Sequence, residues 1–339
     1  MTYPNVFDII VITPVQIEKS SNSPYNMTEA ESTTMNQEIE EEKPSIRIGE
    51  HCKTDRPTPF GQGPTGEVIQ IEGVNVYISR PAGYPQTPSR LLLFLTGATG
   101  LHSLNNQIQA DKFAAEGFLV LLPDQFPDDP LPGTATYVEE EDPSIIDKMK
   151  YRVAETAKSF LIDMWLARQT PEKVLPLIKK VIDGAHEKFP DAISHGGGVY
   201  CVGYCFGGRM TLLLASEKLD MTMSSMWAQS IPDEETGRIK SGPYIKAGAI
   251  AHATLVAKED FEGVKVPLAF VCVENDQLFA DEVKKYGEEM MKSQNVECEF
   301  HTYPNVPHGF GVVGEYTDAR IRRAQAVAFE QMIIWFKKH

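Results

Sequence analysis

The sequence predicts an α/β fold in one large domain, with a mostly parallel central sheet and helices on both faces. Continuous apolar runs such as Leu91–Leu95 and Val266–Val273 indicate strands buried on both faces. These runs alternate with predicted helices such as Pro171–Phe189, a pattern typical of parallel sheets covered by helices. With 339 residues, 42% of them hydrophobic, the chain can fill a sizeable core.

The predicted elements follow a loop at 57–66 that is rich in proline and glycine. The predicted strands are Glu67–Glu72, Val74–Ser79, Leu91–Leu95, Val199–Val202, Val266–Val273 and Glu299–Tyr303. The predicted helices are Asn105–Glu116, Ser144–Gln169, Pro171–Phe189, Gly208–Lys218, Asp281–Ser293 and Asp318–Lys338.

The first 50 residues differ in composition from the rest. They hold nine acidic and three basic residues, and 16–43 is rich in Ser, Thr, Asn and Glu. Such a segment buries too little apolar surface to offset the entropy lost on ordering. We therefore predict a disordered acidic extension at 1–50 and one folded domain at 51–339, with Met27 and Met35 as alternative starts of the native chain.

Charge and cysteine usage exclude several classes of protein. A net charge of −15 argues against a nucleic-acid partner, which requires clustered basic residues. The apolar stretch 6–15 is too short to span a bilayer and contains Asp8 and Pro14, so no membrane anchor is expected. The five cysteines show neither C-x-x-C nor zinc-type spacing, so we expect no metal, no disulfide framework and a cytoplasmic location.

The segment Gly203–Gly208, with the sequence GYCFGG, joins a predicted strand to a predicted helix. A sharp strand-to-helix turn with small residues around a central nucleophile is the nucleophile elbow of α/β-hydrolases. Side chains at Gly203 or Gly207 would collide with the neighbouring strand or helix. The central residue, Cys205, is thus the candidate nucleophile; the competing interpretation is a buried core cysteine, as expected for Cys201.

Two further residues complete a triad in the chain order of this fold, which is nucleophile, acid, histidine. Asp276 follows the predicted strand Val266–Val273, at the edge where open α/β sheets place their sites. His308 lies in the loop after Glu299–Tyr303, next to Gly309. Glu274 and Asp281 are the competing acids.

GYCFGG, the sequence Glu274-Asn275-Asp276 and the sequence PHGF at 307–310 together resemble the dienelactone hydrolase (carboxymethylenebutenolidase) family of the α/β-hydrolase fold. The resemblance extends from about Gly66 to the C-terminus. It implies a single α/β-hydrolase domain that acts on small-molecule esters or lactones without a cofactor.

In this mechanism His308 takes the thiol proton, and Asp276 orients the imidazole. The helix N-terminus and the imidazolium both favour a thiolate at Cys205. The backbone N–H of Phe206 is the first predicted oxyanion donor. The resemblance places the second donor at Ala98, with Gly97 as the other choice. The predicted substrate-pocket residues are Gly97, Tyr204, Trp165, His252 and Phe310.

Two positions depart from the pattern of the bacterial family members. Gly97 stands where they carry a glutamate that helps to generate the thiolate. Val312 stands where they carry an arginine that binds the substrate carboxylate, and Arg152 and Arg168 are the alternatives for that role. A carboxylated lactone is therefore a weaker expectation for this chain than for the family.

The segment 133–170 either caps the site, with Trp165 as an apolar wall, or forms an amphipathic helix with Trp165 in the core. The leading functional hypothesis is a cysteine-dependent hydrolase of small esters or lactones that forms an acyl-cysteine intermediate. The alternative is a non-catalytic ligand-binding protein of the same fold. A third hypothesis is a redox sensor based on Cys205, although no resolving cysteine is near it in sequence.

Overall fold

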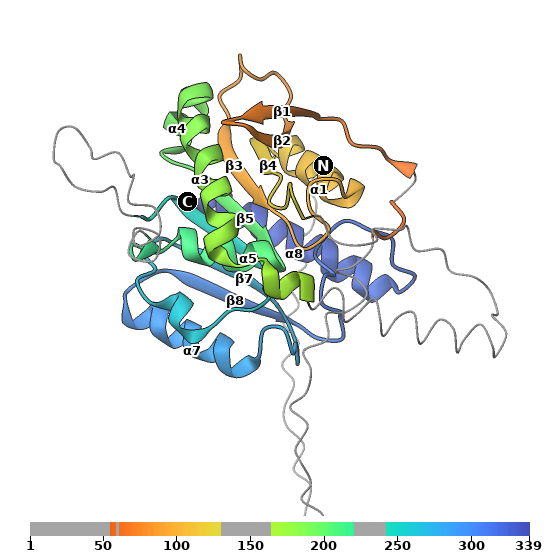
Figure 1. Ribbon diagram of the computed structural model, residues 1–339. Helices are drawn as coiled ribbons and strands as arrows, with labels where there is room; N and C mark the ends of the chain where they lie inside the picture. Colours follow the sequence, from red (N-terminus) through yellow and green to blue (C-terminus); the bar gives the residue numbers. More distant parts are fainter. Residues whose placement is uncertain (1–54, 59–60, 130–163, 220–241) are drawn as a thin grey trace, which may run out of the picture. The chain divides into compact units, whose positions relative to one another are not determined.

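The computed structural model describes residues 55–58, 61–129, 164–219 and 242–339. These residues form an eight-stranded sheet in the order β1-β2-β4-β3-β5-β6-β7-β8 (Figure 1). The strands are β1 (Glu67–Ile71), β2 (Val74–Ser79), β3 (Arg90–Leu95), β4 (Phe118–Pro123), β5 (Tyr200–Tyr204), β6 (Ala247–Ala251), β7 (Leu268–Val273) and β8 (Cys298–Tyr303).

The sheet combines an antiparallel edge with a parallel centre. β1 pairs with β2, and β2 with β4, in antiparallel fashion. All pairings from β4 through β3, β5, β6 and β7 to β8 are parallel. Every residue of β4, β5, β6 and β7 is buried, as continuous apolar runs predict for strands covered on both faces. The predicted α/β-hydrolase fold is confirmed.

Helices cover both faces of the sheet. They are α1 (Leu104–Ala115), α3 (Pro171–Lys188), α4 (Pro190–Gly196), α5 (Phe206–Leu214), α7 (Asp281–Ser293), α8 (Ala319–Lys338) and the short 3-10 helix η3 (Lys258–Phe261). Phe113 of α1 and Trp335 of α8 belong to one core cluster, whereas Ile178 of α3, Leu212 of α5 and Met291 of α7 belong to a second cluster. The two clusters are the two layers between sheet and helices.

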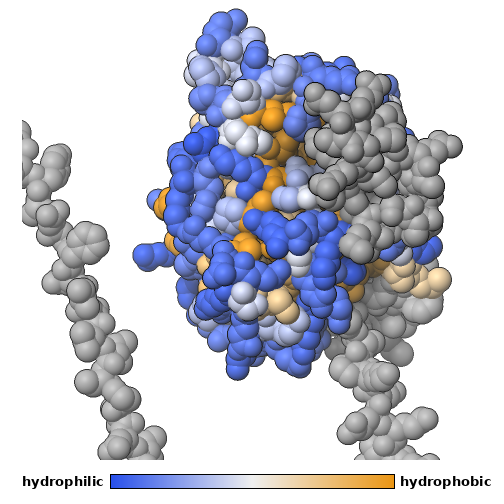
Figure 2. Space-filling model, turned by 90° about the vertical axis from the view of Figure 1, so that its left-hand side faces the viewer, coloured by the Kyte–Doolittle hydropathy of each residue, from blue (hydrophilic) through white to orange (hydrophobic). Residues whose placement is uncertain are grey.

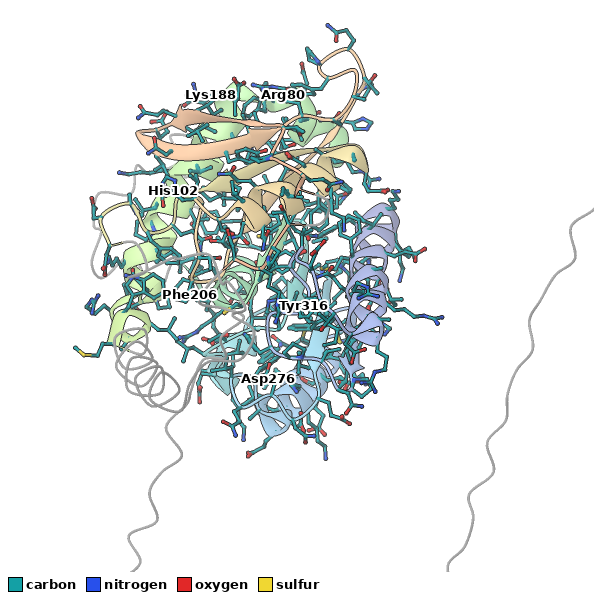
Figure 3. All side chains as sticks on the ribbon, turned by 90° about the vertical axis from the view of Figure 1, so that its right-hand side faces the viewer. Arg80, His102, Lys188, Phe206, Asp276 and Tyr316 are labelled. Atoms are coloured by element: carbon teal, nitrogen blue, oxygen red, sulfur yellow. The ribbon has the colours of Figure 1, made fainter. Side chains whose placement is uncertain are left out.

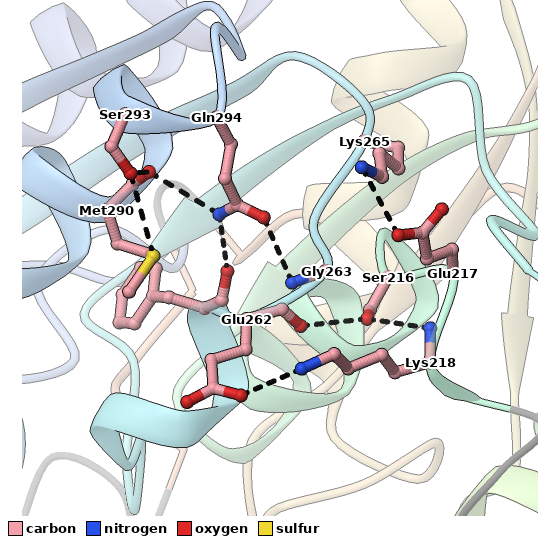
Figure 4. Close-up of polar contacts among 10 residues, drawn as sticks. Ser216, Glu217, Lys218, Glu262, Gly263, Lys265, Met290, Ser293 and Gln294 are labelled. Carbon is pink, nitrogen blue, oxygen red and sulfur yellow. Dashed lines mark hydrogen bonds and ion pairs between the residues drawn. The ribbon is translucent and has the colours of Figure 1, made fainter.

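Most predicted elements agree with the structure to within one or two residues, but α5 is a correction. It spans Phe206–Leu214 rather than Gly208–Lys218. The chain leaves the helix because Ser216 forms an antiparallel bridge with Val264. Ser216 Oγ donates to the carbonyl of Glu262 at 3.1 Å and accepts from the backbone N–H of Lys218 at 3.1 Å (Figure 4). The contacts of Ser216 with Val264 and Glu262 and its hydrogen bond from Lys218 replace the last predicted turn.

The sequence interpretation also missed α4, which follows α3 after a break at Phe189 and begins at Pro190. The predicted extension at 1–50 and most of the predicted cap lie outside the described residues. Within the described ranges, no helix combines the length and the apolar character needed to cross a bilayer. The face shown in Figure 2 is hydrophilic over most of its area, with apolar residues in a strip across its centre.

Candidate functional site

Cys205 lies between the last residue of β5 and the first residue of α5. Its backbone has φ 52° and ψ −115°, a conformation that a residue with a side chain rarely adopts. A Cβ at Gly203 would lie 2.2 Å from the carbonyl oxygen of Gly207, and one at Gly207 would lie 2.3 Å from that of Leu95. The turn can therefore form only because both flanking residues lack a side chain.

Asp276 and His308 lie in the loops that follow β7 and β8, two strands adjacent in the sheet. His308 Nδ1 is 2.7 Å from Asp276 Oδ2, and only 7% and 4% of their side-chain surfaces are exposed. Asp276 Oδ1 accepts the backbone N–H of Leu278 at 3.0 Å. The carboxylate is thus fixed through both oxygens, and it fixes the imidazole in turn.

The loop after β6 brings Thr254 beside both His308 and Cys205. Thr254 Oγ1 is 3.1 Å from Cys205 Sγ and 3.1 Å from His308 Nε2. The structure thus gathers Cys205, His308 and Asp276 at the carboxyl ends of β5, β7 and β8, together with a hydroxyl that sequence analysis did not single out. Figure 3 shows Phe206 and Asp276 in the same part of the molecule as Tyr316, away from Arg80.

The pKa values of the two buried histidines in this region are shifted in opposite directions. Burial acts to lower the pKa of His308, but hydrogen bonds to Asp276 and Cys205 and the charges of both groups raise it to about 9. Burial holds the pKa of His252 well below its usual value, and the neighbouring His308 lowers it further. The two rings meet edge to face, with 5.0 Å between their centroids. His252 is therefore the neutral member of the pair.

The loop after β3 passes directly beside the nucleophile elbow. A Cβ at Gly97 would lie 3.1 Å from Cys205 Cβ and 3.6 Å from its Sγ. The backbone N–H of Gly207 donates to the carbonyl of Thr96 at 3.0 Å and ties the start of α5 to this loop. Thr96 N–H in turn donates to Gln125 Oε1 at 2.6 Å. The loop is fixed on both sides, and its glycine gives the thiol space.

A pocket opens onto Cys205. Three of the five predicted pocket residues, Gly97, Tyr204 and His252, contribute to its walls. The lining residues are Asp55, Arg56, Gly97, Ala98, Thr99, Asn105, Asn106, Tyr204, Cys205, His252, Gly309, Val312, Val313 and Tyr316. Polar side chains thus make up much of this wall.

Trp165 and Phe310 are corrections, because neither lines the pocket. Trp165 is wholly buried, donates from Nε1 to the carbonyl of Asp129 at 2.7 Å and packs edge to face against Phe126. Its core interpretation was the right one of the two. Phe310 is also wholly buried and packs between Tyr303 and His252, so it supports the pocket wall from behind.

Sequence analysis missed Asp55 and Arg56, which reach the pocket from the segment before β1. Asp55 accepts the Ser103 hydroxyl and the backbone N–H of Leu104 at the start of α1. Arg56 donates from Nη1 to the carbonyl of Glu315 at 3.2 Å, and its guanidinium lies 4.0 Å from the centroid of the Tyr316 ring. These contacts join residues that are far apart in the chain, so no local sequence pattern predicts them.

Of the two arginines considered for the pocket, Arg152 lies outside the described residues. Arg168 does not line the pocket; it pairs with Asp129 at 3.3 Å and is half exposed. Val312, in the position of the arginine of the bacterial enzymes, does line it. Within the part of the chain that the structure describes, no group of three or more His, Cys, Asp or Glu side chains is arranged to hold a metal ion.

Comparison with known proteins agrees with this fold. The family model described as the dienelactone hydrolase family matches residues 74–339. The chain belongs to the dienelactone hydrolase family. This membership makes it a relative of hydrolases, as expected from GYCFGG and PHGF.

Two fungal members and one bacterial structure illustrate the relationship. Hydrolase pyvD of Aspergillus violaceofuscus is 25% identical over 275 residues, which cover 81% of this chain and 90% of that protein. Dienlactone hydrolase 1 of Gibberella moniliformis is 29% identical over 274 residues, which cover 80% and 87%. A putative dienelactone hydrolase from Klebsiella pneumoniae has a TM-score of 0.56 at 16% identity, covering 81% of this chain and 99% of that one, and supports the fold.

Proposed function

We propose that this dienelactone hydrolase family member is a cysteine-dependent hydrolase of small esters or lactones, with Cys205, His308 and Asp276 as its triad. The observation that supports the proposal is the series of side-chain contacts that links these three residues beside a pocket that Cys205 lines. His308 Nδ1 is 2.7 Å from Asp276 Oδ2, His308 also contacts Cys205, and Thr254 Oγ1 lies 3.1 Å from both His308 Nε2 and Cys205 Sγ. Nucleophilic acyl transfer uses a nucleophile, a base and an acid that orients the base, all linked by hydrogen bonds.

In the first half of the reaction, Cys205 transfers its proton to His308 Nε2, and Sγ attacks the substrate carbonyl carbon. The carbonyl oxygen becomes an oxyanion, which the backbone N–H groups of Phe206 and Ala98 are proposed to bind. Collapse of this intermediate breaks the bond to the alcohol oxygen, which takes the proton from His308. The acyl group remains on Cys205 as a thioester.

In the second half, His308 Nε2 accepts a proton from water, and the water oxygen attacks the thioester carbon. The carbon–sulfur bond breaks, the acid product leaves, and the proton returns from His308 to Cys205. Asp276 stays ionised throughout and stabilises the imidazolium. No step requires a cofactor.

The residues that line the pocket indicate which class of substrate it favours. Gly97 supplies no carboxylate beside the thiol, and Val312 supplies no cation, which argues against a strict requirement for a carboxylated lactone. Arg56 does bring a positive charge to the pocket. Small esters, lactones and activated aryl esters or thioesters are therefore the proposed substrates. Cys201 and Cys272 are buried in strands and unpaired, which supports a reducing, cytoplasmic location.

The test is the hydrolysis of p-nitrophenyl acetate and of a dienelactone by the wild type, Cys205→Ala and Cys298→Ala. Cys298 is a partly exposed cysteine of β8 and serves as the matched control. We expect Cys205→Ala to abolish hydrolysis and Cys298→Ala to retain it. Equal activity of Cys205→Ala and wild type would overturn the proposal. Inactivity of every protein towards both substrates would favour the ligand-binding alternative.

A further inference from the structure

The side chain of Thr254 occupies a defined position beside the two groups that the proposed mechanism uses. Its Oγ1 lies 3.1 Å from Cys205 Sγ and 3.1 Å from His308 Nε2. The whole residue is buried, with no exposed surface. Hydrogen bonds to sulfur are normally longer than those to oxygen, so the contact with the thiol is close. Thiol, hydroxyl and imidazole form a compact, largely buried cluster beside the pocket that Cys205 lines.

The backbone holds this hydroxyl in place. Thr254 N–H donates to the carbonyl of Cys205 at 3.1 Å, and Cys205 N–H donates to the carbonyl of Ala251 at 3.0 Å. In the same loop, His252 and Leu255 have φ of 37° and 60°, in the left-handed region that non-glycine residues rarely occupy. Such strain persists only where the surrounding structure imposes it, and it concentrates at functional sites.

A hydroxyl has one proton to donate and a lone pair to accept, so Thr254 can serve both neighbours in either proton arrangement. With a neutral thiol, the S–H donates to Oγ1 and the hydroxyl donates to His308 Nε2. After the proton has moved, Nε2–H donates to Oγ1 and the hydroxyl donates to the thiolate. The S–H bond breaks and an N–H bond forms, while Thr254 ends with one O–H bond as before.

We propose that Thr254 is a further catalytic residue, whose hydroxyl stabilises the thiolate–imidazolium pair by reversing the direction of these two hydrogen bonds. The inference rests on the proposed function of Cys205. It also accounts for a departure from the bacterial enzymes. Gly97 offers the thiol no side chain, and Thr254 contributes a polar group to it from a different loop.

Other ionisable groups share the pocket and must stay constant in the test. His252, Tyr204, Asp55 and Arg56 line the pocket, whereas His308 contacts His252 and pairs with Asp276 behind it. Substitutions confined to Thr254 leave all of them in place. Thr254→Val removes the hydroxyl and keeps the shape of the side chain, whereas Thr254→Ser keeps the hydroxyl and removes a methyl group.

The experiment measures the rate at which iodoacetamide alkylates Cys205 between about pH 5 and pH 10 in the wild type and both variants. Tandem mass spectrometry distinguishes Cys205 from the buried Cys201 on the same peptide. Hydrolysis of p-nitrophenyl acetate is measured in parallel, and circular dichroism verifies folding. If Thr254→Val does not fold, Thr254→Ala is the second variant without a hydroxyl.

We expect the variant without a hydroxyl to be alkylated about tenfold more slowly at neutral pH, with its profile displaced upwards by about one pH unit. Thr254→Ser should follow the wild type. If the variant without a hydroxyl has the wild-type pH profile of alkylation, the role of Thr254 is overturned. The same holds if Thr254→Ser and Thr254→Val lose alkylation rate equally. If Cys205→Ala hydrolyses p-nitrophenyl acetate as fast as the wild type, the proposed function on which that role rests is overturned instead. Alkylation distinguishes the two failures because it reports on the thiol without any ester substrate.

Discussion

Asp276 holds His308 in a single orientation. Oδ2 of the carboxylate lies 2.7 Å from Nδ1 of the imidazole, and the other carboxylate oxygen is occupied by the backbone N–H of Leu278. With Nδ1 directed at a carboxylate, that nitrogen carries a proton and Nε2 faces Thr254. The imidazole is therefore oriented to exchange a proton on the side of Cys205.

Replacement of Asp276 by asparagine removes the charge and favours the wrong tautomer of His308. We expect Asp276→Asn to lower kcat for p-nitrophenyl acetate by about 10³–10⁴-fold, with the fold retained. Glu274→Gln is the matched control, because Glu274 follows the same strand but is exposed. If the two variants lose activity equally, Asp276 has no special place in the triad.

The raised pKa of His308 makes the stability of the protein depend on pH. The folded state holds this proton up to about pH 9, whereas an unfolded histidine releases it near its ordinary pKa of about 6.5. The contribution is thus fully present below about pH 6.5 and is lost as the pH rises through about 9, with a magnitude on the order of 3 kcal/mol.

Urea unfolding of the wild type and His308→Gln at several pH values measures this effect. The free energy of unfolding of the wild type should fall more steeply with rising pH than that of the variant. Parallel pH profiles would show that His308 is not protonated preferentially in the folded state.

The nucleophile elbow tolerates no side chain at Gly203, because a Cβ there would lie 2.2 Å from a backbone oxygen. We expect Gly203→Ala to destabilise the fold by about 3 kcal/mol or more, visible as a lower melting temperature. A Cβ at Gly63 would meet no atom within 4 Å, so Gly63→Ala should have the melting temperature of the wild type. Equal melting of both variants would contradict the described turn.

Arg56 brings positive charge to the pocket and should favour an anionic substrate. Arg56→Ala should raise KM for an ester that carries a carboxylate by about tenfold, and change KM for the neutral p-nitrophenyl acetate much less. Arg80→Ala serves as the control, since Arg80 is an exposed residue paired with Glu67. A uniform change in KM for both substrates would assign Arg56 to structure alone.

The sequence predicted most strands of the sheet and pointed to the three candidate triad residues because these signals are local. Strands β5, β7 and β8 end at Tyr204, Val273 and Tyr303, and the candidate side chains follow within a few residues. The end of α5 could not be predicted, since it depends on the pairing of Ser216 with Val264 across the fold.

The pocket wall was harder to predict for the same reason. Arg56 is held at the site by its hydrogen bond to the carbonyl of Glu315, which lies 259 residues further along the chain. Thr254 belongs to no recognisable motif, and only the strained loop after β6 brings its hydroxyl to the thiol. Trp165 was ambiguous because a large apolar side chain suits a core and a pocket wall equally well, and packing against Phe126 decides between them.

The most direct test of the account is to trap the covalent intermediate. The protein is mixed with excess p-nitrophenyl acetate, quenched with acid within one turnover and analysed by tandem mass spectrometry, with Cys205→Ala as the control. The account predicts one acetyl group on Cys205, formed together with a burst of p-nitrophenol and absent from the control. Steady hydrolysis with no acetyl group on Cys205, or with the acetyl group on another residue, would contradict it.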